Sequence, residues 1–128
     1  MLYYGHQQIA EKGKAVMKAV VIKTTKDKSV VEFEHSTCYE TLKTAVGGWI
    51  ERVSLGDTEL WVNEEGKLTG LDINPTATAL WADMYGLTDV VMGDVIITGG
   101  SDDEGETLGL KDELVEYFLN YNKEVLFI

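Results

Sequence analysis

Cysteine, proline and histidine are scarce in this sequence, and their scarcity excludes several kinds of site. The chain has one cysteine, one proline and two histidines among 128 residues. One cysteine forms no disulfide within the chain and no multi-cysteine zinc site, and two histidines are too few for a multi-histidine metal site. No apolar run approaches the roughly 18 residues of a membrane-spanning helix. We therefore expect no metal site, no internal disulfide and no membrane partner.

Basic residues are also few, and more than half of them lie near the N-terminus. The chain has 11 Lys+Arg against 22 Asp+Glu, a formal net charge of −11. Residues 1–29 hold six lysines and two acids, a net charge of +4, so residues 30–128 carry −15. Contacts to phosphate need clustered lysine and arginine side chains. The acidic balance therefore predicts no direct binding to nucleic acid.

Length and composition fit one domain of ordinary size, and the first 16 residues stand apart from it. Hydrophobic residues make up 45% of the chain, as is typical of globular proteins. Met17 precedes a strongly apolar strand pattern, and codons for residues 11–14 would be purine-rich like a ribosome-binding site. We expect residues 1–16 to be a non-native leader or a flexible tail and residues 17–128 to form a single domain. A helix over residues 6–16 is the alternative.

The periodicity of apolar residues predicts an α+β fold. The expected order is ββαββαβα(β), a single layer of mixed, mainly antiparallel sheet packed by about three helices. Turn-forming residues separate the elements. Strands are expected at 19–24, 30–34, 49–55, 58–63 and 94–98, with a weaker strand or extended loop at 68–73, a closing strand at 125–128, and helices from about 37 to 46, from 75 to 85 and around 110–121.

Capping residues mark where the first two helices begin and end. Thr37 and Glu40 have the spacing of a capping box, and Gly47 follows the last helical residue as a left-handed cap requires. Asn74 followed by proline is a typical helix start. Four residues of the second helix are expected on its buried stripe: Ala77, Leu80, Trp81 and Met84.

Nothing in the sequence has the pattern of a catalytic site. Cys38 and His35 lie three residues apart at a helix start, and Cys38 is interpreted as a small core residue. The acidic loop 101–106 is interpreted as a solvated surface loop, with weak binding of divalent cations as the alternative. An enzyme would need carboxylates with shifted pKa values in a cleft, for which Glu51, Asp72 and Asp94 are available. We expect no catalytic residues and no cofactor.

Four short motifs occur in a familiar order. They are VGGWIE at 46–51, VNEEGK at 62–67, NPTAT at 74–78 and GDVII at 93–97. In these motifs the chain resembles a family of bacteria and phages described as domain of unknown function 3846. The resemblance covers roughly residues 18–100. It implies a small cytoplasmic protein, often encoded by a phage, and it implies no particular activity.

The second and third motifs contain the candidate ligand-binding residues. Asn63, Glu64, Glu65 and Lys67 place an amide, two carboxylates and an amine on one turn, and Asn74 begins the following helix. A helix N-terminus beside a lysine is able to receive an anion. The structural interpretation is that the asparagines form turns and caps and that the charged side chains face solvent.

Trp49 and Trp61 are the candidate interface residues. The hairpin register places them near each other, and two outward-facing tryptophans would form an apolar patch. The main hypothesis is a non-enzymatic accessory protein that binds a host protein or itself as a homodimer. Mimicry of DNA by rows of surface acids is one form of this hypothesis. The alternative is a domain that binds a small anionic metabolite or nucleotide at the turn 63–67 and the helix start at Asn74.

Overall fold

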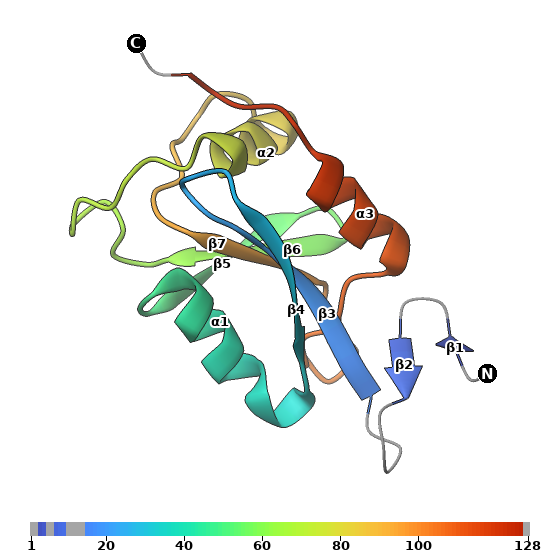
Figure 1. Ribbon diagram of the computed structural model, residues 1–128. Helices are drawn as coiled ribbons and strands as arrows, with labels where there is room; N and C mark the ends of the chain where they lie inside the picture. Colours follow the sequence, from blue (N-terminus) through green and yellow to red (C-terminus); the bar gives the residue numbers. More distant parts are fainter. Residues whose placement is uncertain (1–2, 5–6, 10–14, 127–128) are drawn as a thin grey trace.

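Seven antiparallel strands form one sheet in the computed structural model, which describes residues 3–4, 7–9 and 15–126 (Figure 1). The strand order is β1-β2-β3-β7-β6-β5, and β4 pairs with the other edge of β3. The element order confirms the predicted α+β fold. The strands are β1 (Tyr3–Tyr4), β2 (Gln7–Ile9), β3 (Ala15–Ile22), β4 (Lys28–Phe33), β5 (Ile50–Leu55), β6 (Thr58–Asn63) and β7 (Val95–Gly99), and the helices are α1 (Cys38–Val46), α2 (Pro75–Tyr85) and α3 (Asp112–Asn120).

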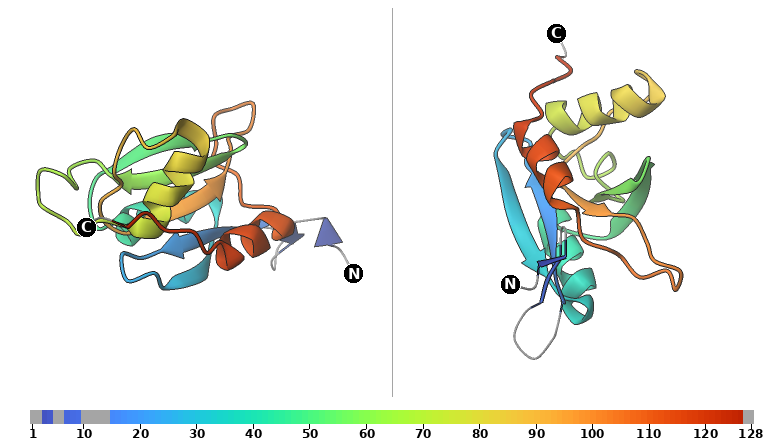
Figure 2. Two further views of the ribbon diagram at one scale, coloured as in Figure 1. Left: turned by 90° about the horizontal axis from the view of Figure 1, so that it is seen from above. Right: turned by 90° about the vertical axis from the view of Figure 1, so that its right-hand side faces the viewer.

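The two faces of the sheet are covered by different helices. Ala19 and Val21 of β3 face a core cluster that includes Leu42 and Val46 of α1. Val20 and Ile22 face the opposite way, into a larger cluster formed with α2 and α3. Alternate side chains of a strand point to opposite faces, so the continuous apolar run of β3 reflects burial on both. Figures 1 and 2 show α1 and α2 on opposite sides of the strands β5 to β7.

One edge of β3 is shared by three segments of the chain. β7 pairs with Val20–Ile22, and β2 pairs with Ala15 and Val16. Between them, the backbone N–H of Leu110 donates to the carbonyl of Lys18 at 2.8 Å. Strand β3, predicted over residues 19–24, begins earlier than expected, at Ala15.

The alternative prediction of a helix over residues 6–16 is wrong for residues 7–9, 15 and 16, which are the part of this segment that the structure describes. Gln7–Ile9 form a strand, and Ala15 and Val16 already belong to β3. Much of the expected leader or tail, residues 1–2, 5–6 and 10–14, lies outside the described residues.

Helix α1 ends as predicted but begins differently. Gly47 adopts a left-handed conformation with φ of 75°, and its N–H donates to the carbonyl of Lys43. The capping box predicted for Thr37 and Glu40 is wrong. The hydroxyl of Thr37 is instead bonded to the backbone of Glu34, at 3.0 and 3.2 Å, because a 3₁₀ turn over His35–Thr37 precedes α1.

Helix α2 is buried over its first half and leaves the core over its second half. Its buried residues form one continuous run over 76–80, whereas Met84 is 47% exposed. Met84 was expected in the core, but this end of α2 lies over the sheet edge. There the hydroxyl of Tyr85 donates to the carbonyl of Ser54 in β5, which among the described strands pairs with β6 alone.

The C-terminal segment contains further differences from expectation. The ammonium of Lys28 donates to the carbonyls of Leu119 and Tyr121 and so caps the C-terminal end of α3. Tyr117, expected on the apolar stripe of α3, is 52% exposed. Residues 125–126 form no strand, although the N–H of Val125 donates to the carbonyl of Pro75. Residues 127–128 of the expected closing strand lie outside the described residues.

Replacing Asn74 by alanine tests the hydrogen bonds at the start of α2. The Asn74 amide is fully buried, donates to the carbonyls of Ile22 and Gly93, and accepts the N–H of Ala77. We expect Asn74→Ala to lower the free energy of unfolding by about 2–4 kcal/mol, because it removes a cap and two hydrogen bonds to carbonyls in the core. Urea unfolding measures this change. The exposed Asn120 is the control, for which about 0.5 kcal/mol is expected, and equal losses would contradict the assignment.

Replacing Gly109 by alanine tests the close crossing of the chain over β3. A β carbon at Gly109 would lie 2.8 Å from the Met17 Cβ and 2.9 Å from the Lys18 nitrogen. Since neither atom belongs to the end of a flexible side chain, we expect a loss of about 1–3 kcal/mol in thermal unfolding. Ser101→Ala in the exposed part of the preceding loop is the control. An unchanged melting temperature for Gly109→Ala would rule out this crossing.

Candidate functional site

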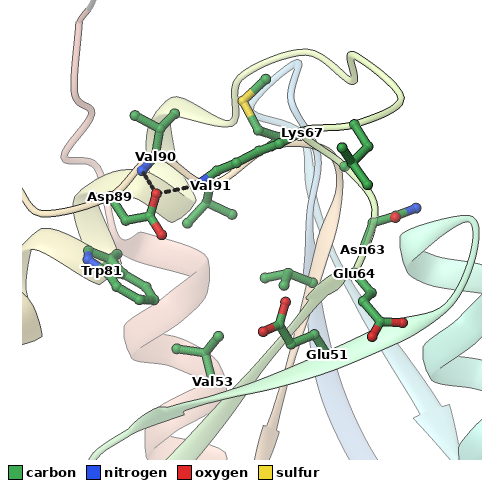
Figure 3. Close-up of a pocket in the computed structure, with 13 residues that line it drawn as sticks. Glu51, Val53, Asn63, Glu64, Lys67, Trp81, Asp89, Val90 and Val91 are labelled. Carbon is green, nitrogen blue, oxygen red and sulfur yellow. Dashed lines mark hydrogen bonds and ion pairs between the residues drawn. The ribbon is translucent and has the colours of Figure 1, made fainter.

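A pocket of about 190 Å³ opens between the edge of the sheet and helix α2 (Figure 3). Strands β5 and β6 supply one wall, the turn after β6 supplies the second, and α2 with the segment before β7 supplies the third. The pocket is lined by Glu51, Val53, Val62, Asn63, Glu64, Gly66, Lys67, Leu68, Trp81, Asp89, Val90, Val91 and Met92. It therefore joins the β5–β6 hairpin and the turn after it with α2 and the segment before β7.

The walls of the pocket are apolar and its rim is charged. Val53, Val62 and Trp81 are partly buried and pack against the large core cluster, of which Val91 is a buried member. The four charged residues, Glu51, Glu64, Lys67 and Asp89, are all exposed. An apolar interior with polar groups at its mouth suits a guest that has an apolar body and a polar end.

The one lysine of the pocket is bonded to an acid of the pocket. The ammonium of Lys67 donates to a carboxylate oxygen of Asp89, which also accepts the N–H of Val90 at 2.8 Å (Figure 3). The bond from Lys67 and, after it, the bond from Val90 lower the pKa of Asp89. Asp89 is therefore ionised at neutral pH, and the positive charge of Lys67 is largely compensated.

Two carboxylates of the rim have no such partner. Within the described part of the chain, no hydrogen bond or ion pair involves the carboxylates of Glu51 or Glu64. Three acids and one lysine give the pocket a formal charge of −2. Figure 3 shows Trp81 and Asp89 on one side of the pocket and Glu51 and Glu64 on the other. The electrostatics of the pocket favour a cationic guest over an anionic one.

Trp81 is held in place by its neighbours. Its indole N–H donates to the hydroxyl of Thr88 at 2.9 Å, and its ring lies 4.7 Å from the ring of Tyr85. The Tyr85 hydroxyl is in turn bonded to Ser54 of β5. These contacts hold α2 against the sheet edge and fix the aromatic wall.

A second, larger groove lies beside the pocket. It has a volume of about 750 Å³ and shares Lys67, Asp89, Val90 and Met92 with the pocket, so that the Lys67–Asp89 ion pair stands between the two. We call it the leucine groove, because Leu87 and Leu126 line it and are 77% and 75% exposed. Leu68, in the wall of the pocket, is 87% exposed.

The structure brings three of the five predicted ligand-binding residues to this pocket. Asn63, Glu64 and Lys67 line it, whereas Glu65 does not. The side chain of Asn63 is used by the fold, because it donates to the carbonyl of Val46 at 3.2 Å and accepts the N–H of Glu65. Asn74 lies in the core, with its amide bonded to the chain on both sides, and is not part of the pocket.

The sequence did not predict the other residues of the pocket as ligand-binding residues. Trp81 was expected as a core residue, and Asp89 was not considered. Glu51 was named as one of three carboxylates that an enzyme would need. Of the other two, Asp72 is exposed outside the pocket and Asp94 accepts the N–H of Thr24. The signal for Glu51 would have been its position two residues before Val53 in β5, because alternate residues of a strand lie on the same face.

The two tryptophans proposed as an interface differ in exposure. Trp49 is 56% exposed, with the Lys43 ammonium 4.4 Å from its ring centroid. Trp61 is partly buried against the α1 cluster, and its indole N–H donates to Thr98. It lies opposite Arg52, three positions along the hairpin from Trp49. Trp61 therefore offers less exposed surface than Trp49, and an interface formed by both residues stays a prediction.

The surroundings of Cys38 and of the acidic loop 101–106 fit the structural roles that the sequence predicts for them. Burial raises the pKa of the Cys38 thiol, so that the thiol stays protonated at neutral pH. Asp102 accepts the N–H groups of Glu104 and Glu106, which closes the loop on itself.

The described residues include no group of three or more potential ligands placed to hold a metal ion. They also contain no helix with the length and hydropathy of a membrane span.

Titration of Asp89 tests the ion pair that separates the two cavities. Because its pKa is lowered in the folded protein, Asp89 stays ionised to a lower pH than in the unfolded chain. The resulting stabilisation of the folded protein is fully present above pH 3.8, the ordinary pKa of an aspartate. It is lost as the pH falls through the lower pKa that Asp89 has in the folded protein. NMR titration of the side-chain carboxyl should give a midpoint below 3.8, and Lys67→Met should move it up. Lys123→Met, which removes a lysine paired with Asp83, should leave it unchanged. An unaltered midpoint in Lys67→Met would count against the pair.

Comparison with known proteins places the chain in a family. No curated protein and no solved structure matches it. The model of one family, described as domain of unknown function (DUF3846), matches residues 17–123. This match includes β3 from Met17 onward, β4 to β7, the three helices and every residue of the pocket. The chain therefore belongs to the DUF3846 family, as its four motifs predict.

Proposed function

We propose that this protein is a non-enzymatic, cytoplasmic accessory protein of bacteria or phages that binds a partner protein through the pocket and the leucine groove. The observation that carries the proposal is the exposure of Leu68, Leu87 and Leu126, at 87%, 77% and 75%, around two adjoining cavities. Large apolar side chains gathered in this way are typical of interaction sites.

The size of the pocket favours a protein over a small molecule. The pocket, at about 190 Å³, is smaller than the roughly 300–1,000 Å³ of typical small-molecule sites. The leucine groove beside it is larger, and five of its ten lining residues are exposed, among them Leu87 and Leu126. A protein surface is able to place one side chain in the pocket while it covers the leucines, which fits the anatomy of protein interfaces.

Charge favours a basic partner over a second copy of this chain. The net charge is −11, and the pocket itself has a formal charge of −2. Two copies that meet through this face would bring like charges together, whereas a basic protein would be attracted and steered toward it.

Affinity capture with a matched variant tests the proposal. The tagged full chain and its Leu68→Ser variant would be incubated with a bacterial lysate, and recovered proteins compared by quantitative mass spectrometry. We expect at least one basic protein to fall about tenfold in Leu68→Ser, because an exposed leucine contributes only when a partner buries it. Leu108→Ser, outside both cavities, is the control and should retain the partner.

The outcome is decisive only when both variants are folded, which their melting temperatures verify. Recovery of the same proteins in the same amounts by the wild type and Leu68→Ser would overturn the proposal. Loss in both variants alike would also overturn it, because the pocket would then have no special part in binding.

A further inference from the structure

The pocket has the size of a single side chain. Its volume of about 190 Å³ leaves room for an alkyl chain with a small polar head and is small for a nucleotide or a cofactor. It lies within the proposed interface, between the exposed Leu68 and the Lys67–Asp89 ion pair. The inference below rests on the proposed function and specifies which chemical group of the partner enters here.

The interior suits the apolar stem of a long side chain. Val53 and Val62 come from neighbouring strands on the same sheet face, and Val91 closes the opposite side. Trp81 adds an indole ring whose orientation is fixed by Thr88 and Tyr85. Lysine and arginine place their methylene groups along apolar surfaces of this kind and keep the charged head in water.

The rim suits a cationic head. Glu51 and Glu64 line the pocket and are exposed, and their carboxylates have no partner in the described structure. The ring of Trp81 attracts cations through its quadrupole as well. The native Lys67 does not neutralise the two glutamates, because its ammonium is bonded to Asp89 on the other side of the pocket.

We propose that the pocket receives one basic side chain of the partner protein, lysine or arginine. Its alkyl stem packs between the valines and Trp81, and its charged head lies between Glu51 and Glu64. An anionic or neutral polar side chain would leave both glutamates uncompensated and would bury no charge of opposite sign. The pocket thus selects for charge, and the leucines around it supply apolar contact area.

Small probes test this proposal without knowledge of the partner. Nα-acetyl-lysine methylamide and its arginine analogue would be titrated into ¹⁵N-labelled full-length protein. We expect both to shift the amide signals of Val53 and Val62 and the indole signal of Trp81, with dissociation constants of the order of millimolar. The Nε-acetylated lysine probe, which keeps the stem but lacks the charge, should bind about tenfold more weakly.

Two double variants with the same net charge separate the pocket from the charge of the whole chain. Glu51→Gln with Glu64→Gln should weaken binding of the lysine probe about tenfold, since each exposed carboxylate contributes a modest amount. Glu32→Gln with Glu104→Gln removes two exposed acids elsewhere and should leave the affinity within about twofold. All four positions are exposed, so the variants are expected to fold, and their melting temperatures verify this.

The proposal would be overturned if neither basic probe shifts the pocket signals, if the neutral probe binds equally well, or if both double variants bind alike. Its failure is distinguishable from failure of the proposed function. A partner that is lost in Leu68→Ser while the probes do not bind would retain the interface and reject the basic guest. Probe binding with no partner sensitive to Leu68→Ser would retain the basic guest and reject the interface.

Discussion

The buried amide of Asn74 is the interaction on which the arrangement of this protein most depends. Its nitrogen donates to Ile22 at the end of β3 and to Gly93 just before β7, and its oxygen caps α2 at Ala77. Its backbone N–H donates to the carbonyl of Val91. One fully buried residue thus connects the central strands, the first turn of α2 and the segment before β7. These hydrogen bonds join polar groups inside the core, where the loss of a partner is costly.

The pocket is a consequence of this connection together with the shape of the sheet. Asn74 fixes where α2 begins, and the helix then runs outward until Tyr85 reaches Ser54 at the β5 edge. Trp81 is therefore held over the end of the sheet, where β5 has no further strand beyond it among the described elements. The segment 89–92, fixed by the bond to Val91, closes the third side. The space between them is left because a helix that crosses a sheet edge covers the last strand incompletely.

Local patterns in the sequence were sufficient for much of the fold. The β6 bounds at Thr58 and Asn63 match the prediction, and the cap of α2 at Asn74 and the glycine end of α1 were correct as well, because turns and caps depend on a few neighbouring residues. The features that the sequence predicted wrongly depend on residues beyond their immediate neighbours. Met84 follows the helical period but lies past the sheet edge, and the bonding of Thr37 was decided by the 3₁₀ turn before α1.

The candidate site shows the same division between local and distant information. Asn63, Glu64 and Lys67 share one motif and could be named from it, although Asn63 proved to hold the turn. Trp81 and Asp89 meet this turn only through tertiary packing, which no short motif records. The sequence also did not predict the contacts of the Asn74 amide nitrogen in the core. The Asn-Pro pattern predicts a helix cap through the amide oxygen, but it does not tell which carbonyls the nitrogen contacts.

The acidity of the pocket follows from how the chain uses its few bases. Most of the basic residues that the structure describes are engaged away from the pocket: Lys18 with Asp112, Lys26 with Glu124, Arg52 with Glu59, Lys123 with Asp83, Lys28 with the end of α3 and Lys43 with Trp49. Lys67 is the one base at the pocket, and Asp89 holds it. Glu51 and Glu64 thus remain unpaired while bases elsewhere meet acids or carbonyls. The acid excess of the chain therefore reaches this site uncompensated, and the basic side chain that we propose as its guest would offset it.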